Sequence, residues 1–111
     1  MVQYSKLDAG FAALSDQTRR GVLEYLGRRD ASISDLAEHF AMTVTGIKKH
    51  VQILEDVGLV KTRKVGRVRQ CMLGPRRLEH ETTWIARYQE MLEARLDRLG
   101  SFLERTKGKT S

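Results

Sequence analysis

The stretch SISDLAEHFAMTVTGIKKHVQILEDVGLVKTRKVGRVRQCML, residues 32–73, decides the fold. Its apolar residues recur at helical spacing and predict a short helix, a tight turn and a second helix over about 44–57. Thr43 can cap the second helix and Gly58 can end it, because a threonine hydroxyl accepts from free amides and glycine adopts a positive φ easily. Two helices joined by a turn of about 3–4 residues predict a helix-turn-helix over residues 34–57.

The second predicted helix has an apolar face and a polar face. At about 100° per residue, Val44, Ile47, Val51 and Leu54 gather on one side. The opposite side carries Thr45, Lys48, Lys49 and Gln52. We therefore expect this helix to pack on the core with one face and to present cations with the other.

Residues 59–73 predict a β-hairpin directly after this helix, which we call the wing. β-Branched residues flank Val65-Gly66-Arg67, and a central glycine is typical of a tight turn between two strands. Four cations crowd the tip of the hairpin: Arg63, Lys64, Arg67 and Arg69. The wing thus adds its cations to those of the helix that precedes it.

A first helix is predicted over about 5–14, and a second one follows a cap at Ser15 or Asp16 and ends at 27–30. The last helix is predicted over 75–103, with a frayed tail over 104–111, and residues 1–14 and 75–103 are the expected dimerisation segments. Pro75 suits the first turn of the last helix, along which apolar residues recur every seven positions. This helix would be too long for its own small domain to cover, so we expect a second copy of the chain to cover it across a two-fold interface. The residues expected in this interface are Leu7, Phe11, Leu78, Ile85, Tyr88, Leu92, Leu96 and Leu99. The alternative is a helix that folds back on its own core.

The predicted architecture is mainly α with a small β-hairpin, in the order α-α-α-α-β-β-α. A chain of 111 residues corresponds to one domain, which we expect to span residues 1–111. This length excludes barrel and doubly wound enzyme scaffolds, which need well over about 200 residues.

The net charge of +6 is concentrated in one third of the chain. Residues 43–77 contain nine basic and two acidic residues, a balance of +7, while the rest of the chain has a balance of −1. A local cationic surface on a small domain indicates a polyanionic partner, with nucleic acid the first candidate. The alternative is an ordinary solvated charged face.

The remaining composition bears on the compartment. A single cysteine, Cys71, excludes an intramolecular disulfide and fits a reducing environment. The N-terminal residues lack the apolar run of a signal peptide, and no stretch reaches membrane-spanning length. We therefore expect a cytoplasmic protein with no membrane partner.

Several runs of the sequence resemble the arsenic-repressor (ArsR/SmtB) family of winged helix-turn-helix transcriptional regulators. LDAGFAALSDQTRRGVLEYL, residues 7–26, resembles the family's opening pair of helices, with Thr18-Arg19-Arg20 in the characteristic place. Residues 32–67 resemble its helix-turn-helix and wing, and His50 with the run LEDVGLV over 54–60 is the most telling part. The resemblance implies a DNA-binding dimer built from the first and last helices, with paired recognition helices in successive major grooves.

Two features depart from the family pattern. Gln17 stands where many members carry proline, and Gly46 and Lys48 replace the commoner alanine and serine in the recognition helix. The last two changes leave the operator sequence open.

The chemistry of these side chains predicts how they meet DNA. One of Lys48 and Lys49 would reach guanine and the other a phosphate, while Gln52 can pair with adenine and Thr45 with a thymine methyl group or a hydrogen-bond acceptor. Thr43 leaves amides free for a phosphate, and Gly46 either permits close approach of the backbone or is neutral. The wing contacts would come from Arg63, Lys64, Arg67 and Arg69, with Arg67 nearest the minor groove because it lies at the turn.

The sequence argues against the inducers that the resemblance suggests. A thiolate site on the third helix would need two cysteines, but Ser32 and Ser34 stand there, and hydroxyls cannot replace thiolates for a soft metal. The alternatives left open are a zinc site from His80 and Glu81 of two chains and a redox response at Cys71. We expect no cofactor and no metal, and the effector ligand remains unknown.

Two rival functions predict different sequences. An enzyme would need a catalytic triad, a phosphate-binding loop or a paired histidine motif, and none is present on a single face. A winged helix that binds protein would have a weakly charged wing and recognition face. We therefore expect a dimeric transcriptional regulator, a repressor by resemblance, that binds a palindromic operator in double-stranded DNA.

Overall fold

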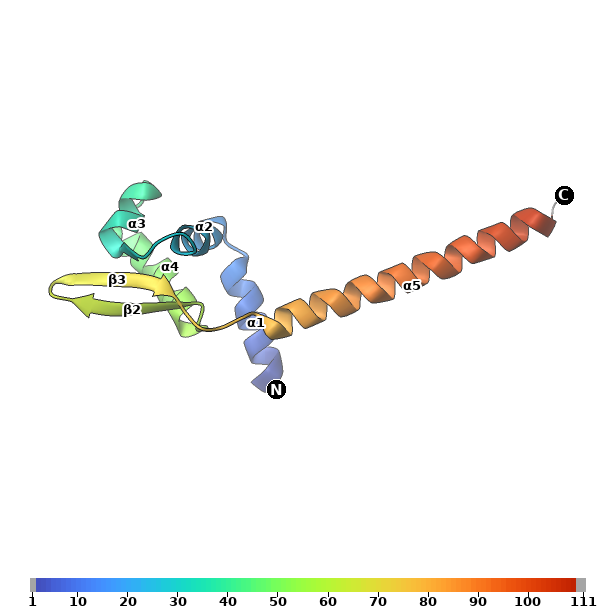
Figure 1. Ribbon diagram of the computed structural model, residues 1–111, viewed down its shortest axis with the longest axis horizontal. Helices are drawn as coiled ribbons and strands as arrows, with labels where there is room; N and C mark the ends of the chain where they lie inside the picture. The colour runs from blue at the N-terminus through green and yellow to red at the C-terminus, as the bar shows by residue number, and fades with distance from the viewer. Residues whose placement is uncertain (1, 110–111) are drawn as a thin grey trace. The chain divides into compact units, whose positions relative to one another are not determined.

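The structure is a computed structural model that describes the backbone of residues 2–109 and the side chains of residues 6–105 (Figure 1). Its elements are α1 (Val2–Leu14), α2 (Gln17–Leu26), β1 (Ala31–Ser32), α3 (Ile33–His39), α4 (Val44–Asp56), β2 (Val60–Val65), β3 (Val68–Leu73) and α5 (Glu79–Lys109). This order is the predicted one with one addition, the short strand β1. The predicted winged helix-turn-helix fold is confirmed.

The chain divides into two compact units, Met1–Leu78 and Glu79–Ser111. The first unit holds the four short helices and the sheet, and the second unit is α5. The expectation of one domain over 1–111 stays a prediction.

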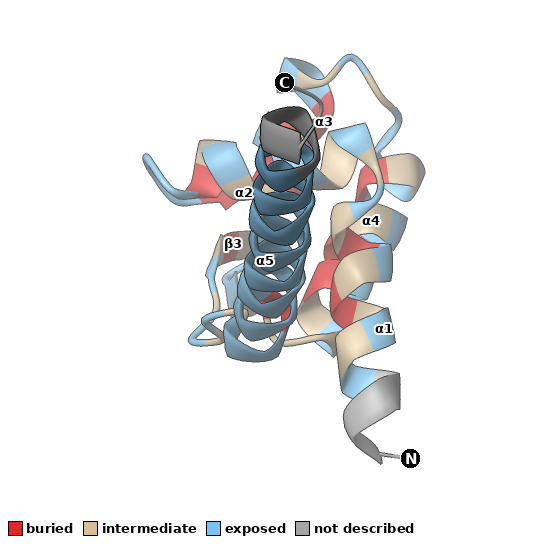
Figure 2. Cartoon of the chain, turned by 90° about the vertical axis from the view of Figure 1, so that its right-hand side faces the viewer, coloured by how far each residue is buried: buried red, intermediate tan, exposed pale blue. Residues whose placement is uncertain are grey.

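The core of the first unit lies where α2, α3 and α4 meet the sheet. Its largest fully buried side chains include Val22, Leu36, Ile47 and Leu54, one or two from each of these helices. Figure 2 shows buried positions along α3 and α4 with exposed positions on their outer sides. Val44 was expected on the buried face of α4 but is 44% exposed, because it begins the first turn of the helix.

The helix-turn-helix is fixed by capping at three helix ends. The Ser32 hydroxyl accepts from the Asp35 amide, and the Asp35 carboxylate accepts from the Ser32 amide, which together form a capping box at the start of α3. At the end of α3, Met42 N–H donates to Ala37 O at 2.9 Å, and Ala41 takes a φ of +53°. This turn directs the chain into α4, where the Thr43 hydroxyl accepts from Gly46 N–H at 3.0 Å.

The end of α4 leads into the wing. Leu59 N–H donates to Leu54 O at 2.9 Å and Gly58 N–H to Glu55 O at 3.0 Å, with a φ of +82° at Gly58. This is the Schellman arrangement, in which a left-handed glycine ends the helix, as the sequence predicted.

The sheet has three antiparallel strands in the order β1-β3-β2. Strands β2 and β3 pair from Val60 opposite Leu73 to Val65 opposite Val68, with Gly66 and Arg67 as the turn. Gly66 has a φ of +63°, which a tight hairpin turn needs at its first position. Strand β1 was not predicted because its two residues are too few to show an alternating pattern.

Arg19, from the run that resembles the family's opening helices, connects three helices of the first unit. Its guanidinium donates to Ala13 O at 2.8 Å and Ala12 O at 2.9 Å, where α1 ends. It also lies 3.3 Å from His50 Nδ1 on α4. The Arg19 amide donates to the N-cap carboxylate of Asp16, and this hydrogen bond lowers the pKa of Asp16.

The last helix was predicted over 75–103, and both ends are wrong. Helix α5 begins at Glu79 and continues to Lys109, so most of the predicted tail is helical. The segment before it is held in an irregular path by Arg76, whose guanidinium donates to Val57 O at 2.9 Å and Lys6 O at 3.1 Å. Leu78 follows with a φ of +57°, so the helix cannot start at Pro75. No proline lies between residue 103 and the end of α5 to stop the helix earlier.

Candidate nucleic-acid interface

The outer face of α4 carries the side chains predicted to meet DNA. Thr45, Lys48, Lys49 and Gln52 are all exposed, while Ile47, Val51 and Leu54 are buried on the opposite face. The helix therefore presents two lysines, an amide and a hydroxyl to solvent, while its opposite face packs on the core.

Two residues of α4 have contacts that the sequence did not indicate. Gln52 Nε2 donates to Asp56 Oδ1 at 2.8 Å, so the amide predicted to read adenine is held along its own helix. At Gly46, a Cβ atom would lie 3.1 Å from the Thr43 hydroxyl oxygen and 3.3 Å from Met42 Cε. Glycine at this position thus leaves room for the helix cap, which is a structural reason separate from approach to a groove.

The wing separates its predicted contacts onto two faces. Side chains alternate along a strand, and residues that pair across strands share a face. Lys64 pairs with Arg69, and both lie on the face of Thr62 and Cys71, which is turned toward the core. Arg63 is exposed on the opposite face. The fold therefore brings together Lys64 and Arg69, while Arg63 points away from them.

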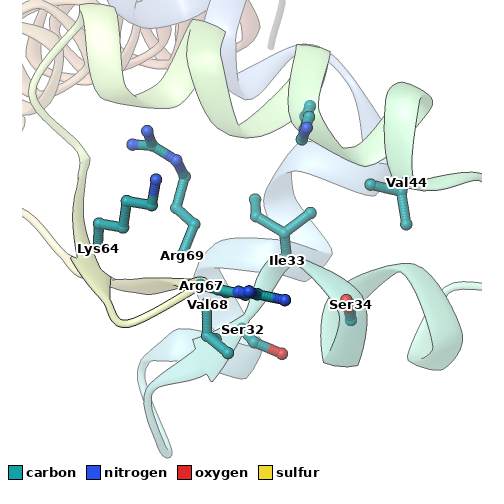
Figure 3. A pocket seen from close by; sticks show the side chains of 9 residues that line it. Ser32, Ile33, Ser34, Val44, Lys64, Arg67, Val68 and Arg69 are labelled. Atoms are coloured by element: carbon teal, nitrogen blue, oxygen red, sulfur yellow. The ribbon is translucent and has the colours of Figure 1, made fainter.

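A groove of about 460 Å³ lies between the start of α3, the outer face of α4 and the wing. Its lining residues are Ser32, Ile33, Ser34, Val44, Lys48, Lys64, Arg67, Val68 and Arg69. Figure 3 shows Lys64 and Arg69 extending from the wing toward α4, with Arg67 extending toward the start of α3. We call this feature the basic groove. Three of the four predicted wing cations and one predicted α4 cation therefore line a single surface feature.

A chain of hydrogen bonds joins the wing to α4 beside the basic groove. The Glu55 carboxylate accepts from the Thr62 hydroxyl at 2.7 Å and from the Thr62 amide at 3.2 Å. The Thr62 hydroxyl in turn accepts from Arg69 Nη1 at 2.8 Å. These contacts fix the first strand of the wing against the recognition helix. The link between Glu55 and Thr62 was not predicted, because no spacing rule relates a helix residue to a strand residue seven positions later.

His50 belongs to the packing of the helices. It is half-buried, and its Nδ1 lies 3.3 Å from Arg19 Nη1 and 3.9 Å from Asp16 Oδ1 at the start of α2. His50 therefore links α4 to the start of α2, and Arg19 extends this link to the end of α1.

The residues expected in a dimer interface fall into three environments. On α5, Ile85, Tyr88, Leu92, Leu96 and Leu99 are between 43% and 55% exposed. Leu78 lies before α5 and packs against the core of the first unit, so it is not part of the stripe on the helix. Leu7 and Phe11 lie on α1 and are half-buried. Figure 2 shows α5 with exposed residues along its length.

Cys71 is poorly suited to redox sensing. It is fully buried in the core, and burial, with a smaller contribution from the charge of Glu55, raises the pKa of its thiol to about 11. A thiol reacts through its thiolate, and a raised pKa leaves little thiolate at neutral pH. Within the described residues, no three histidine, cysteine or acidic side chains cluster as metal ligands. The same part of the chain holds no helix long and apolar enough to cross a membrane.

The helix-turn-helix, the paired strands of the wing and the cationic outer face of α4 define a winged helix-turn-helix protein of the DNA-binding class. The comparisons with known proteins lead to the same class. A helix-turn-helix domain profile matches residues 14–63. The chain is 41% identical to an ArsR family transcriptional regulator of known crystal structure, with a TM-score of 0.70, over 79% of this chain and 97% of that one.

Two further relatives extend the similarity. An ArsR-like transcriptional regulator from Rhodococcus sp. RHA1 is 36% identical with a TM-score of 0.60, and the match covers 95% of each chain. The transcriptional repressor SdpR of Bacillus subtilis (strain 168) is 30% identical over 78 residues, which are 70% of this chain and 87% of SdpR. The chain belongs to the ArsR family of DNA-binding transcriptional regulators, and the resemblance seen in its sequence is confirmed. This family is a class of regulators and not a class of enzymes.

Proposed function

We propose that this chain is a homodimeric repressor that binds a palindromic operator in double-stranded DNA and blocks the promoter that the operator overlaps. It acts in the cytoplasm, where it competes with RNA polymerase for the same DNA. The observation that supports this most is the position of Lys48 on the exposed face of α4 and in the lining of the basic groove, next to the wing.

The recognition helix supplies the sequence-reading contacts. Lys48 and Lys49 contact guanine and phosphate, and Thr45 contacts thymine from the first turn of α4. Gln52 pairs with adenine after it releases the carboxylate of Asp56, an exposed partner that water can replace. Thr43 and Gly46 hold the N-terminal turn of α4 in the conformation that approaches DNA.

The wing supplies contacts beside the recognition helix. The cations that make these contacts are Arg63, Lys64, Arg67 and Arg69. Because Glu55 and Thr62 fix the wing against α4, both elements approach the DNA as one unit. Such coupling stabilises binding, since less conformational entropy is lost when the contacts form.

The dimer forms through α5 together with α1. An exposed apolar stripe with a seven-residue spacing, from Ile85 through Leu92 to Leu99, suits packing against the same stripe of a second copy. Tyr88 and Leu96 widen this stripe, and Leu7 and Phe11 contribute from α1. Two-fold symmetry then places two recognition helices in half-sites about 10 base pairs apart or a multiple of that distance.

No resident metal or cofactor is part of this proposal. The zinc alternative needs His80, which is exposed, and Glu81, which is buried, to act with the same pair of a second chain. The redox alternative is disfavoured by the burial of Cys71. Footprinting of the purified protein on the DNA upstream of its own gene tests the proposal, and a protected, inverted repeat is the expected result. Absence of any protected site on that DNA and on a pool of random duplexes would overturn it.

A further inference from the structure

The basic groove concentrates positive charge without acidic residues in its lining. Four of its nine lining residues are cations: Lys48, Lys64, Arg67 and Arg69. Across the described side chains, no carboxylate forms an ion pair with any of these four. Like charges around one concave surface repel each other, and an anion that enters the groove relieves this repulsion.

Glu55 on α4 and Asp35 on α3, two acidic residues of the helices that line the groove, are engaged in hydrogen bonds of their own. The Glu55 carboxylate accepts two hydrogen bonds from Thr62, and the Asp35 carboxylate accepts from the Ser32 amide in the capping box. Neither acid belongs to the groove lining. Glu55 lines an adjoining pocket together with Lys48 and Arg69, so the basic groove itself has cations and no carboxylate in its lining.

The groove also contains hydroxyl groups and apolar carbon. Ser34 is exposed at the start of α3, and Ser32 is buried with its hydroxyl oxygen accepting from the Asp35 amide, which leaves its proton free to donate. Val44 and Val68 are 44% and 49% exposed and flank the cations. Cations and hydroxyls together suit a phosphate, while exposed valines suit the carbon of a deoxyribose beside it.

We propose that the basic groove binds one backbone phosphate of each DNA half-site, with Lys48, Arg67 and the Ser34 hydroxyl as its ligands. This inference rests on the proposed function. Three elements (α3, α4 and the wing) then hold the same DNA strand. Ser34 becomes a DNA-binding residue, and Arg67 contacts a phosphate in place of the minor groove expected from its position at the turn.

Arg69 has a positioning role at this site. Its Nη1 is committed to the Thr62 hydroxyl, and through Thr62 it is linked to Glu55 on α4. The guanidinium therefore stays in the groove, where its charge attracts the phosphate. The groove volume of about 460 Å³ lies within the range of roughly 300–1,000 Å³ that is typical of ligand sites, so the groove has room for a phosphate group.

The test combines single neutral phosphates with single substitutions in the dimer. A duplex selected from a random pool by the native protein is resynthesised with one methylphosphonate at a time, and its affinity is measured for the native protein and for Arg67→Ala. We expect one phosphate per half-site whose neutralisation weakens native binding by between about 10-fold and 100-fold, the effect of a charge-assisted hydrogen bond. The same neutralisation has little effect on Arg67→Ala.

The matched control is Arg63→Ala, which removes an arginine from the opposite face of the wing. This variant should retain the full effect of neutralising the groove phosphate. Ser34→Ala should weaken binding less than Arg67→Ala, and Ser34→Asp should weaken it more by adding a negative charge. Circular dichroism checks that each variant is folded.

Three results would overturn the inference. If native protein and Arg67→Ala respond equally to every methylphosphonate, the groove holds no backbone phosphate, although DNA binding stands. If inorganic phosphate saturates the DNA-free protein at Ser34 and the methylphosphonate profile is flat, the occupant is a free anion. If the native protein selects no duplex at all, the proposed function fails together with the inference.

Discussion

Lys48→Ala is the substitution that best separates the proposed DNA contacts from a merely charged surface. Lys48 is exposed on α4 and lines the basic groove, and the substitution to alanine keeps the helix intact. Each phosphate neutralised by a protein cation contributes about 0.9 to the slope of log affinity against log salt concentration. A two-fold dimer loses two contacts, so we expect the slope to become less steep by about 1.8.

This change in slope has a direct consequence for affinity. Between 50 and 200 mM salt, a slope difference of about 1.8 shrinks the advantage of the native protein over Lys48→Ala by about tenfold. Fluorescence anisotropy with a selected duplex, repeated at five salt concentrations, measures both slopes. The control is Arg28→Ala, which removes an exposed cation outside the groove and should leave the slope unchanged. An unchanged slope for Lys48→Ala would refute its contact with a phosphate, and a change of about 0.9 would refute the symmetric dimer.

Three further predictions concern the dimer, the thiol and the core. Leu92→Asp should convert the protein to a monomer in sedimentation equilibrium and abolish operator binding. The control Arg87→Ala, also on α5, should remain dimeric, and a dimeric Leu92→Asp protein would contradict the proposed interface. Cys71 should resist iodoacetamide in the folded protein at pH 8 and react faster as the pH rises toward about 11, while the unfolded chain reacts near the ordinary thiol pKa. Equal reaction rates for the folded and the unfolded chain, measured by mass spectrometry, would refute the burial of Cys71. Leu54→Ala should lower the free energy of unfolding by about 2–5 kcal/mol in urea titrations, because Leu54 is fully buried, and a loss below about 1 kcal/mol would place it outside the core.

The local elements of the fold could be predicted because their signals are short-range. Thr43 and Gly58 mark the two ends of α4, and Gly66 marks the turn of the wing. Each of these residues acts on its neighbours in sequence through a hydrogen bond or a backbone angle. A pattern of this kind is visible without knowledge of the rest of the chain.

The features that the sequence did not reveal depend on distant contacts. Helix α5 starts four residues later than predicted because Arg76 hydrogen-bonds to Val57 and Lys6, which are far away in sequence. The link from Glu55 through Thr62 to Arg69 likewise joins a helix to two strands. Such contacts arise only when the elements pack, so a single sequence carries no periodic trace of them.

Most residues of the candidate interface were predicted from the sequence, but which of them lie on the same surface was not. The four cations at the tip of the wing were predicted to act as one group, yet strand alternation places Arg63 on the opposite face from Lys64 and Arg69. Ser34 was considered only as a position unsuited to a soft metal, and it lies in the lining of the basic groove. The grouping of side chains on one surface therefore required the fold.

The central claim, that a symmetric dimer recognises a particular DNA sequence with α4 and the wing, is tested most directly by one titration. A duplex selected from a random pool and a scrambled duplex of equal length are each titrated with native protein at physiological salt, with the stoichiometry and affinity recorded. The account predicts two chains per selected duplex and a preference of at least about 10³-fold over the scrambled one. Binding of a single chain, or equal affinity for both duplexes, would contradict it.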